Sequence, residues 1–188
     1  MLFDLPLHTT NNYDGQLTNQ KGLHSLWESM IPELELGNYQ LNSLHKATYL
    51  KQPVLVIWEA INRSSKLVPI MLQKEREVSA QFTEEQKFRV QIRRGRESKS
   101  YTTAFAKAYA TALKTSINEQ LLNSADMIAD FWYTSWVDAG KPDLTALAPG
   151  WDAAAKQKWE NEWQLFSNNK LLESKLLLAK KAETKESE

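Results

Sequence analysis

The sequence predicts an all-α protein built as a single helical domain. Apolar residues recur at three- and four-residue steps through most of the chain, the spacing that places them on one face of a helix. With 188 residues, 42% of them hydrophobic and 24% charged, the chain is long enough for one buried core and has the composition of a globular protein. One short segment, 88–93, alternates apolar and polar residues instead, so we expect it to be extended.

Two helices are expected in the first half of the chain. The first covers residues 23–36 and is short, because Pro32 removes a backbone donor and crowds the preceding turn, which ends or kinks a helix. The second begins at Pro53, which suits the first turn of a helix, and runs to about Ala80 as a core helix. Pro69 lies inside this pattern, so a bend is expected there.

Helical spacing returns after the extended segment and continues to Trp136. We expect two consecutive helices in this region, or one helix that bends near Thr115. Gly140 and Pro142 supply the stop, with glycine just past the last turn and proline beyond it. The apolar stripe that ends with Trp132 and Trp136 is expected to belong to the core rather than to form a platform for stacking bases.

The chain divides into a main body, 1–144, an appended helical part, 145–178, and a tail, 179–188. The tail is charged and lacks apolar anchors, so we expect it to be disordered. Asp152 is placed to cap the appended helix. This helix has an aromatic stripe that needs a partner, in a second copy of the chain or in another protein: Trp159, Trp163 and Phe166.

Charge and composition argue against several classes of function. Lysine plus arginine equals aspartate plus glutamate at 23 each, so no overall field attracts nucleic acid or an anionic membrane. The chain has no cysteine, which excludes disulfides, thiolate zinc sites and a cysteine nucleophile. No apolar run reaches the length of a bilayer, and the start, MLFDLPLH, lacks the pattern of a signal peptide. The sequence therefore assigns no compartment, and metal ligands must be His, Asp or Glu.

The stretch PLHTTNNYDGQLTNQKGLHSLWE carries the candidate chemistry. His24 and Glu28 lie four residues apart, which places them on one face of a helix. His8 joins them if the polar loop between the histidines folds back. Two imidazoles and one carboxylate are the ligand set expected of a zinc ion that keeps a fourth position open for water or substrate. On spacing alone, a metal site and a chance grouping of histidines are both open.

The same stretch resembles the central metal-binding segment of the zinc-dependent phospholipase C family, whose superfamily includes the fungal single-strand-specific nucleases. The shared pattern is a histidine after a Pro-Leu or Pro-Met pair, a polar loop, and a second histidine followed four residues later by an acid. The segment FWYTSWVDAGKPDL resembles the last core helix of the bacterial phospholipase C-like branch. The likeness covers about Leu5 to Leu144. Members of this family are commonly exported.

The resemblance implies an all-helical hydrolase of phosphate esters, acting on phospholipid or nucleic acid with up to three zinc ions. It carries over the ligands of one ion: His8, His24 and Glu28. Six residues before His8, where the family has a bridging aspartate, this sequence has Leu2, and Asp4 is out of register as a substitute ligand. We therefore expect the carboxyl-terminal portion of such an enzyme, with at most one zinc site and little activity of its own. A non-catalytic helical interaction module is the alternative.

For each remaining candidate residue, the alternative to a functional role is an ordinary solvated or packed side chain. Asn12, Asn19 and Trp27 are candidate walls of a substrate groove, although Trp27 can equally shield the metal ligands. His45 lacks an acidic neighbour at ligand spacing and is expected at the surface or partly packed. An arginine cluster lies within the extended segment and just after it: Arg89, Arg93, Arg94 and Arg96. Guanidinium groups match phosphates, but in a neutral chain we expect these arginines to be solvated.

Overall fold

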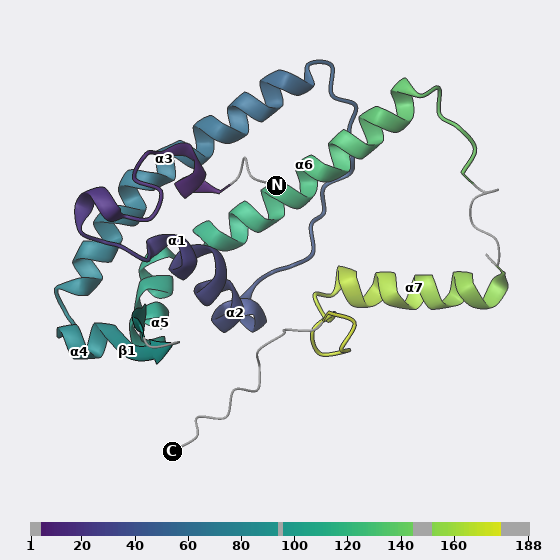
Figure 1. Cartoon of the computed structure of the whole chain (residues 1–188). Helices are drawn as coiled ribbons and strands as arrows, with labels where there is room; N and C mark the ends of the chain where they lie inside the picture. The colour runs from purple at the N-terminus through teal and green to yellow at the C-terminus, as the bar shows by residue number, and fades with distance from the viewer. Residues whose placement is uncertain (1–4, 94–95, 145–151, 178–188) are drawn as a thin grey trace.

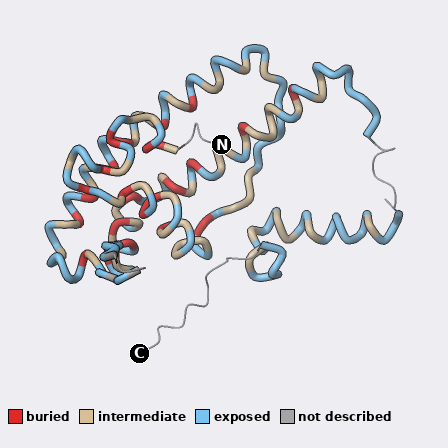
Figure 2. The backbone as a smooth tube through the Cα atoms, viewed as in Figure 1, coloured by how far each residue is buried: buried red, intermediate tan, exposed pale blue. Residues whose placement is uncertain are grey.

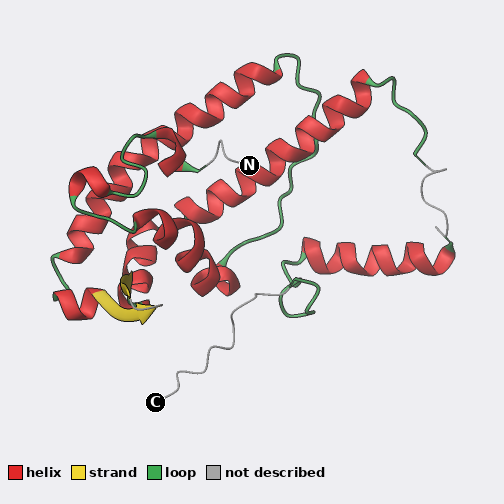
Figure 3. Ribbon diagram, in the orientation of Figure 1, coloured by secondary structure: helices red, strands yellow, loops and turns green. Residues whose placement is uncertain are grey.

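A computed structural model of the chain describes residues 5–93, 96–144 and 152–177. Within these ranges it is all-α apart from one two-stranded hairpin (Figures 1 and 3). In chain order the elements are the 3₁₀ turns η2 (Pro6–Thr9) and η3 (Gln16–Thr18), α1 (Leu23–Ser25), the π turn η4 (Leu26–Met30), α2 (Ile31–Glu35), the 3₁₀ turn η5 (Leu36–Asn38), α3 (Pro53–Ser79), α4 (Glu84–Lys87), β1 (Phe88–Arg93), β2 (Arg96–Tyr101), α5 (Thr103–Leu113), α6 (Ser116–Asp138) and α7 (Ala153–Ser167). The expected disordered tail, 179–188, lies outside the described residues. None of the described helices has both the length and the apolar composition of a membrane span.

The segment expected as one short helix is helical from α1 to η5 but changes its pitch on the way. Pro32 has no amide hydrogen, so the α-helical bond to the carbonyl of Glu28 cannot form. The N–H of Ile31 instead bonds to the carbonyl of Leu26, five residues back, which closes the π turn η4. The proline thus interrupts the regular helix as expected, and the chain continues into α2.

The long helices have the predicted limits. Helix α3 runs unbroken through Pro69 to Ser79. Helices α5 and α6 are separate, and the break falls at Lys114 and Thr115. Gly140 follows the last turn of α6 with φ of +83°, a left-handed conformation that glycine adopts without the steric cost of a Cβ.

The predicted extended segment is one strand of a hairpin rather than an isolated strand. Strand β1 pairs antiparallel with β2, so that Phe88 lies opposite Tyr101 and Val90 lies opposite Lys99. The sequence analysis missed β2 because its sequence, RESKSY, is polar and shows no apolar alternation. The rings of Phe88 and Tyr101, with centroids 4.8 Å apart, join the base of the hairpin to the core.

The core lies where η2, α1, α2, α5 and the second half of α3 meet, which we call the core end. Figure 2 shows buried positions concentrated there. Phe105 and Tyr109 of α5 are both 0% exposed, and the Tyr109 hydroxyl donates to the carbonyl of Met71 in α3 at 2.9 Å. The ring of Phe105 stacks on Tyr101 at 5.0 Å. Helix α5 therefore fastens the hairpin and the second half of α3 to one another.

The opposite part of the molecule, the first half of α3 and the second half of α6, is called the open end. The expectation of a core position is wrong for Trp132, which is 75% exposed, and Trp136 is only partly buried. In α3, Val54 and Trp58 are 64% and 57% exposed, although Ala60 and Ser64 are 0% exposed, so the first half of the predicted core helix is only partly covered. Periodicity shows that a helix has an apolar face, but it does not show how far a neighbour covers that face.

Residues 39–52, called the strap, run along α6 and connect α2 to α3 (Figure 1). Side chains of α6 accept hydrogen bonds from backbone amides of the strap: Asn118 from Gln40, Asp130 from Thr48, and Thr134 from Leu50. Asn169, just past α7, is bound to the strap backbone at Tyr39 and Leu41. The strap is therefore fixed by side chains rather than by secondary structure of its own.

Helix α7 begins where it was predicted to begin. The carboxylate of Asp152 accepts a hydrogen bond from the amide of Ala155 at 2.8 Å and caps the first turn. Trp159 and Trp163 are 50% and 51% exposed, and their rings stack with centroids 5.8 Å apart. Helix α7 is thus a surface helix whose two tryptophans are half exposed.

Candidate metal centre

The three predicted ligands meet at the surface of the core end. His8 comes from η2, His24 from α1 and Glu28 from the π turn η4. His8 Nε2 lies 3.3 Å from Glu28 Oε1, and His24 Nε2 lies 3.0 Å from Glu28 Oε2. One ligand atom from each residue lies within 4.8 Å of the others. Among the described residues, this is the group of His, Asp and Glu side chains that can hold a metal ion.

The three ligand atoms are close enough to share one ion. Zinc ligands at about 2.0–2.1 Å from the metal stand roughly 3.3 Å from one another; here the two histidines lie 3.3 and 3.0 Å from different oxygens of Glu28, and one atom from each residue lies within 4.8 Å of the others. Glu28 Oε1 is buried without a hydrogen bond, since the contact with His8 has the distance of an ion pair but not hydrogen-bond geometry. A buried carboxylate oxygen in this state favours a cation. The residues present therefore fit zinc.

The imidazole of His24 is oriented by a backbone group. Its Nδ1 lies 3.0 Å from the carbonyl oxygen of Tyr13. A carbonyl only accepts hydrogen bonds, so this contact requires the proton on Nδ1, and Nε2, which faces Glu28, is the nitrogen that a metal ion would use. A carbonyl behind the ring of a metal-ligating histidine fixes both its tautomer and its direction. His24 is therefore set as an Nε2 ligand.

The loop between the histidines is closed by its own polar groups. Asp14 Oδ1 accepts hydrogen bonds from the amides of Gly22 and His24, at 3.1 and 3.2 Å. Gly15 has φ of +74°, and a Cβ at this position would lie 2.2 Å from the carbonyl oxygen of Gln20. This turn therefore requires glycine. These two features, which do not involve the ligand side chains, help to return the loop to the start of α1.

The candidate groove residues have different surroundings. Trp27 is 2% exposed and belongs to the hydrophobic core, so it does not line an open groove. Asn12 is buried, and its amide bonds to the amide of Leu17 and the hydroxyl of Thr18 within the loop. Asn19 is exposed, and its role at a groove stays a prediction. Asp4, the other candidate ligand, lies outside the described residues.

His45, expected at the surface or partly packed, has an acidic partner far along the chain. Its Nε2 lies 2.8 Å from Asp130 Oδ1 of α6, and this hydrogen bond raises the pKa of His45 above its usual value. No local pattern predicts this pair, because 85 positions separate the two residues. In the arginine cluster Arg89 is exposed, as expected. Arg94 and the side chains of Arg93 and Arg96 are outside the described part of the chain.

Three residues that hold the ligand loop in place by hydrogen bonds were not predicted from the sequence: Tyr13, Asp14 and Gln20. The Asp14-Gly15 pair carried a signal, since aspartate before glycine is typical of a tight turn. No local signal marks the contact of Gln20 with Glu75, because the two residues are 55 positions apart. The ligands were thus visible in the sequence, whereas most of their supports were not.

Comparisons of the chain with protein-family models, with curated proteins and with solved structures found no match.

Proposed function

We propose that this protein is a zinc-binding phosphoesterase module, in which His8, His24 and Glu28 hold one zinc ion. The observation that carries the proposal is that one ligand atom from each of three residues lies within 4.8 Å of the others, and that Glu28 Oε1, one of the two carboxylate oxygens there, has no hydrogen bond. The reaction class, hydrolysis of phosphodiester bonds, is supported by the resemblance of the ligand segment to the zinc-dependent phospholipase C family.

The side chains at the site would supply different groups to the ion. Glu28 supplies one negative charge against the two positive charges of the ion, and the histidines supply neutral nitrogens, so the site keeps a net positive charge. With side chains 32% and 33% exposed, His8 and His24 leave the outer side of the group accessible to water and substrate. When bound with three protein ligands, zinc lowers the pKa of a water molecule and polarises a phosphoryl oxygen.

Hydrolysis by this chain is expected to be slow. The family uses up to three zinc ions, and the described residues offer one ligand group. Each lost electrostatic contact to the developing charge costs about 3–4 kcal/mol of transition-state stabilisation. We therefore expect clear zinc binding together with weak, chelator-sensitive cleavage of an activated diester such as bis(4-nitrophenyl) phosphate.

The first test is the zinc content of the chain after purification without chelator. We expect close to one zinc per wild-type chain and close to none for His8→Ala, because two ligands hold zinc much more weakly than three. His45→Ala is the matched control, since it removes a histidine that is bound to Asp130 and stands outside the ligand group. A wild-type protein that stays free of zinc, or a His45→Ala variant that loses as much as His8→Ala, would refute the site.

A second candidate function is self-association through α7. It is favoured by the stacked, half-exposed rings of Trp159 and Trp163 and by the absence of net charge on the chain, which removes one source of repulsion between copies. If this is the main function, Trp163→Ala weakens self-association in analytical ultracentrifugation while His8→Ala leaves it unchanged. A monomeric wild-type protein at high concentration would exclude this candidate.

A further inference from the structure

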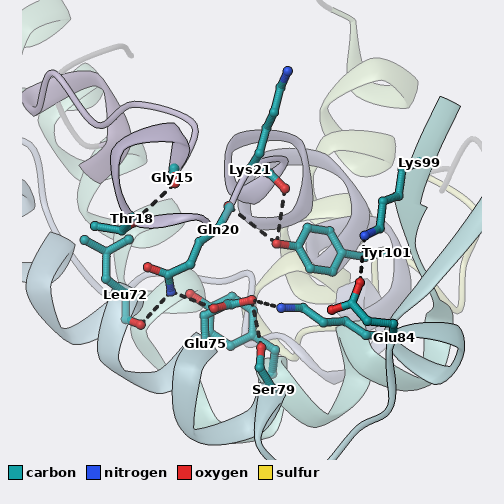
Figure 4. Close-up of polar contacts among 12 residues, drawn as sticks. Gly15, Thr18, Gln20, Lys21, Leu72, Glu75, Ser79, Glu84, Lys99 and Tyr101 are labelled. Atoms are coloured by element: carbon teal, nitrogen blue, oxygen red, sulfur yellow. Dashed lines mark hydrogen bonds and ion pairs between the residues drawn. The ribbon is translucent and has the colours of Figure 1, made fainter.

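The ligand loop is attached to the core by buried contacts around Gln20 that the proposed chemistry does not use; among them, the Tyr101 hydroxyl donates to the backbone carbonyls of Gln20 and Lys21 at 3.5 and 3.4 Å. Gln20, 3% exposed, reaches from the loop to α3, where its Nε2 donates to the carbonyl of Leu72 at 2.8 Å and to Glu75 Oε2 at 2.6 Å (Figure 4). Both partners are acceptors, so the orientation of the amide is fixed. Gln20 Oε1 is buried without a hydrogen bond, which indicates that the amide is held here by its donors.

Glu75 is held as a carboxylate by partners from three directions. It is 1% exposed, and Lys87 Nζ lies 2.7 Å from its Oε1. Ser79 Oγ donates to the same oxygen at 2.9 Å, while Oε2 receives the Gln20 amide. The ammonium of Lys87 lies 5.2 Å from the centroid of the Phe105 ring, which adds a favourable contact for the cation. Glu75 is therefore a rigid acceptor placed deep in the core end.

The loop segment beside Gln20 leads directly to the metal ligands. Gly22 follows two residues later and is bound to Asp14, and His24 lies in α1, which leads directly into the π turn η4 that carries Glu28. The ring of Tyr101 limits this segment from the other side, since a Cβ on Gly22 would lie 3.1 Å from it. A shift of Gln20 would therefore move the start of α1, and with it one of the two histidines.

We propose that Gln20, held by the buried carboxylate of Glu75, is the positioning residue for the metal ligands and sets His24 before an ion arrives. This inference rests on the proposed zinc site. It adds that the loop is preorganised from the core, so that zinc meets a formed site rather than folding one. Outer contacts of this kind typically contribute a factor of about 10 to 100 in metal affinity.

The test uses the full chain and compares Gln20→Met with Ser79→Ala. Gln20→Met keeps the length and volume of the side chain but removes the donor, whereas Ser79→Ala removes a hydrogen bond to the same carboxylate without touching the loop. We expect Gln20→Met to weaken zinc binding about 10- to 100-fold and to alter the visible absorption spectrum of the cobalt-substituted protein. We expect Ser79→Ala to change zinc affinity less than about two-fold, with the wild-type spectrum.

Amide hydrogen exchange of Gly22 and His24 tests the anchoring role of Gln20 independently of zinc binding, because it is measured in the protein without metal. Both amides donate to Asp14, so we expect faster exchange in Gln20→Met and unchanged exchange in Ser79→Ala. If the wild-type protein binds no zinc, the proposed function fails, and this exchange alone decides whether Gln20 anchors the loop. Unchanged exchange in Gln20→Met, or equal effects of the two substitutions, overturns the inference.

Discussion

The two halves of α3 have the same kind of apolar pattern but different surroundings. In the second half Met71 and Val78 belong to the buried core with residues of α5 and η2, whereas in the first half Val54 and Trp58 are more than half exposed and the buried apolar residue is the small Ala60. The core end also carries the candidate metal centre, and the open end carries exposed tryptophans. An apolar helix face positions ligands only where neighbouring elements bury it, because close packing holds the side chains there in place.

The largest expected difference between the two ends comes from removing one aromatic ring from each. Phe105→Ala should lower the free energy of unfolding by about 3–5 kcal/mol, because it leaves a cavity under the hairpin and α3. Trp132→Ala, at a position 75% exposed, should change it by less than about 0.5 kcal/mol. Urea unfolding of both variants measures the contrast, and equal losses would show that the open end is covered in solution.

A second contrast compares two lysine–carboxylate pairs near the hairpin. Lys87→Met should cost about 3 kcal/mol, because it leaves Glu75 buried in the core end without its cation. Lys99→Met should cost at most about 1 kcal/mol, since its pair with Glu84 is exposed on both sides. Thermal and urea unfolding give both values. A small effect of Lys87→Met would mean that the hydrogen bonds of Glu75 are enough to hold its charge.

A third contrast compares two glycines with positive φ. Gly140→Ala, past the end of α6, should cost about 1 kcal/mol from the left-handed backbone alone, because nothing lies within 4 Å of the added Cβ. Gly15→Ala should cost at least about 1 kcal/mol more, since its Cβ meets the backbone of Gln20. The difference in unfolding free energy measures how rigid the ligand loop is, and similar costs would indicate a loop that moves aside.

The smallest expected effect concerns the strap at the open end. The hydrogen bond to Asp130 raises the pKa of His45 in the folded protein, so its stabilising contribution is fully present below the unfolded pKa of about 6.5 and is lost as pH rises through the folded value. Wild-type protein should therefore lose more stability than His45→Gln between pH 5.5 and pH 8.5. Parallel pH profiles of the melting temperature would contradict this linkage.

The sequence predicted local features of the fold well, because their causes are local. The start of α3 follows from Pro53, the end of α6 from Gly140 and the start of α7 from Asp152, each through its own backbone or side-chain chemistry. The polar strand β2 has no such signal, and it is a strand because β1 lies beside it. Pairing partners of this kind are set by the folded chain.

The candidate site divides along the same line. The candidate ligand types, the one-turn spacing of His24 and Glu28, and the aspartate–glycine signal for a turn in the loop can be read from the amino-acid order alone. The contacts of His8 with Glu28 and of Gln20 with Glu75 are set by the folded chain, because each joins segments that are separated in the sequence. Spacing along a helix fixes direction within one turn, whereas distances between segments depend on the packing of the whole core end.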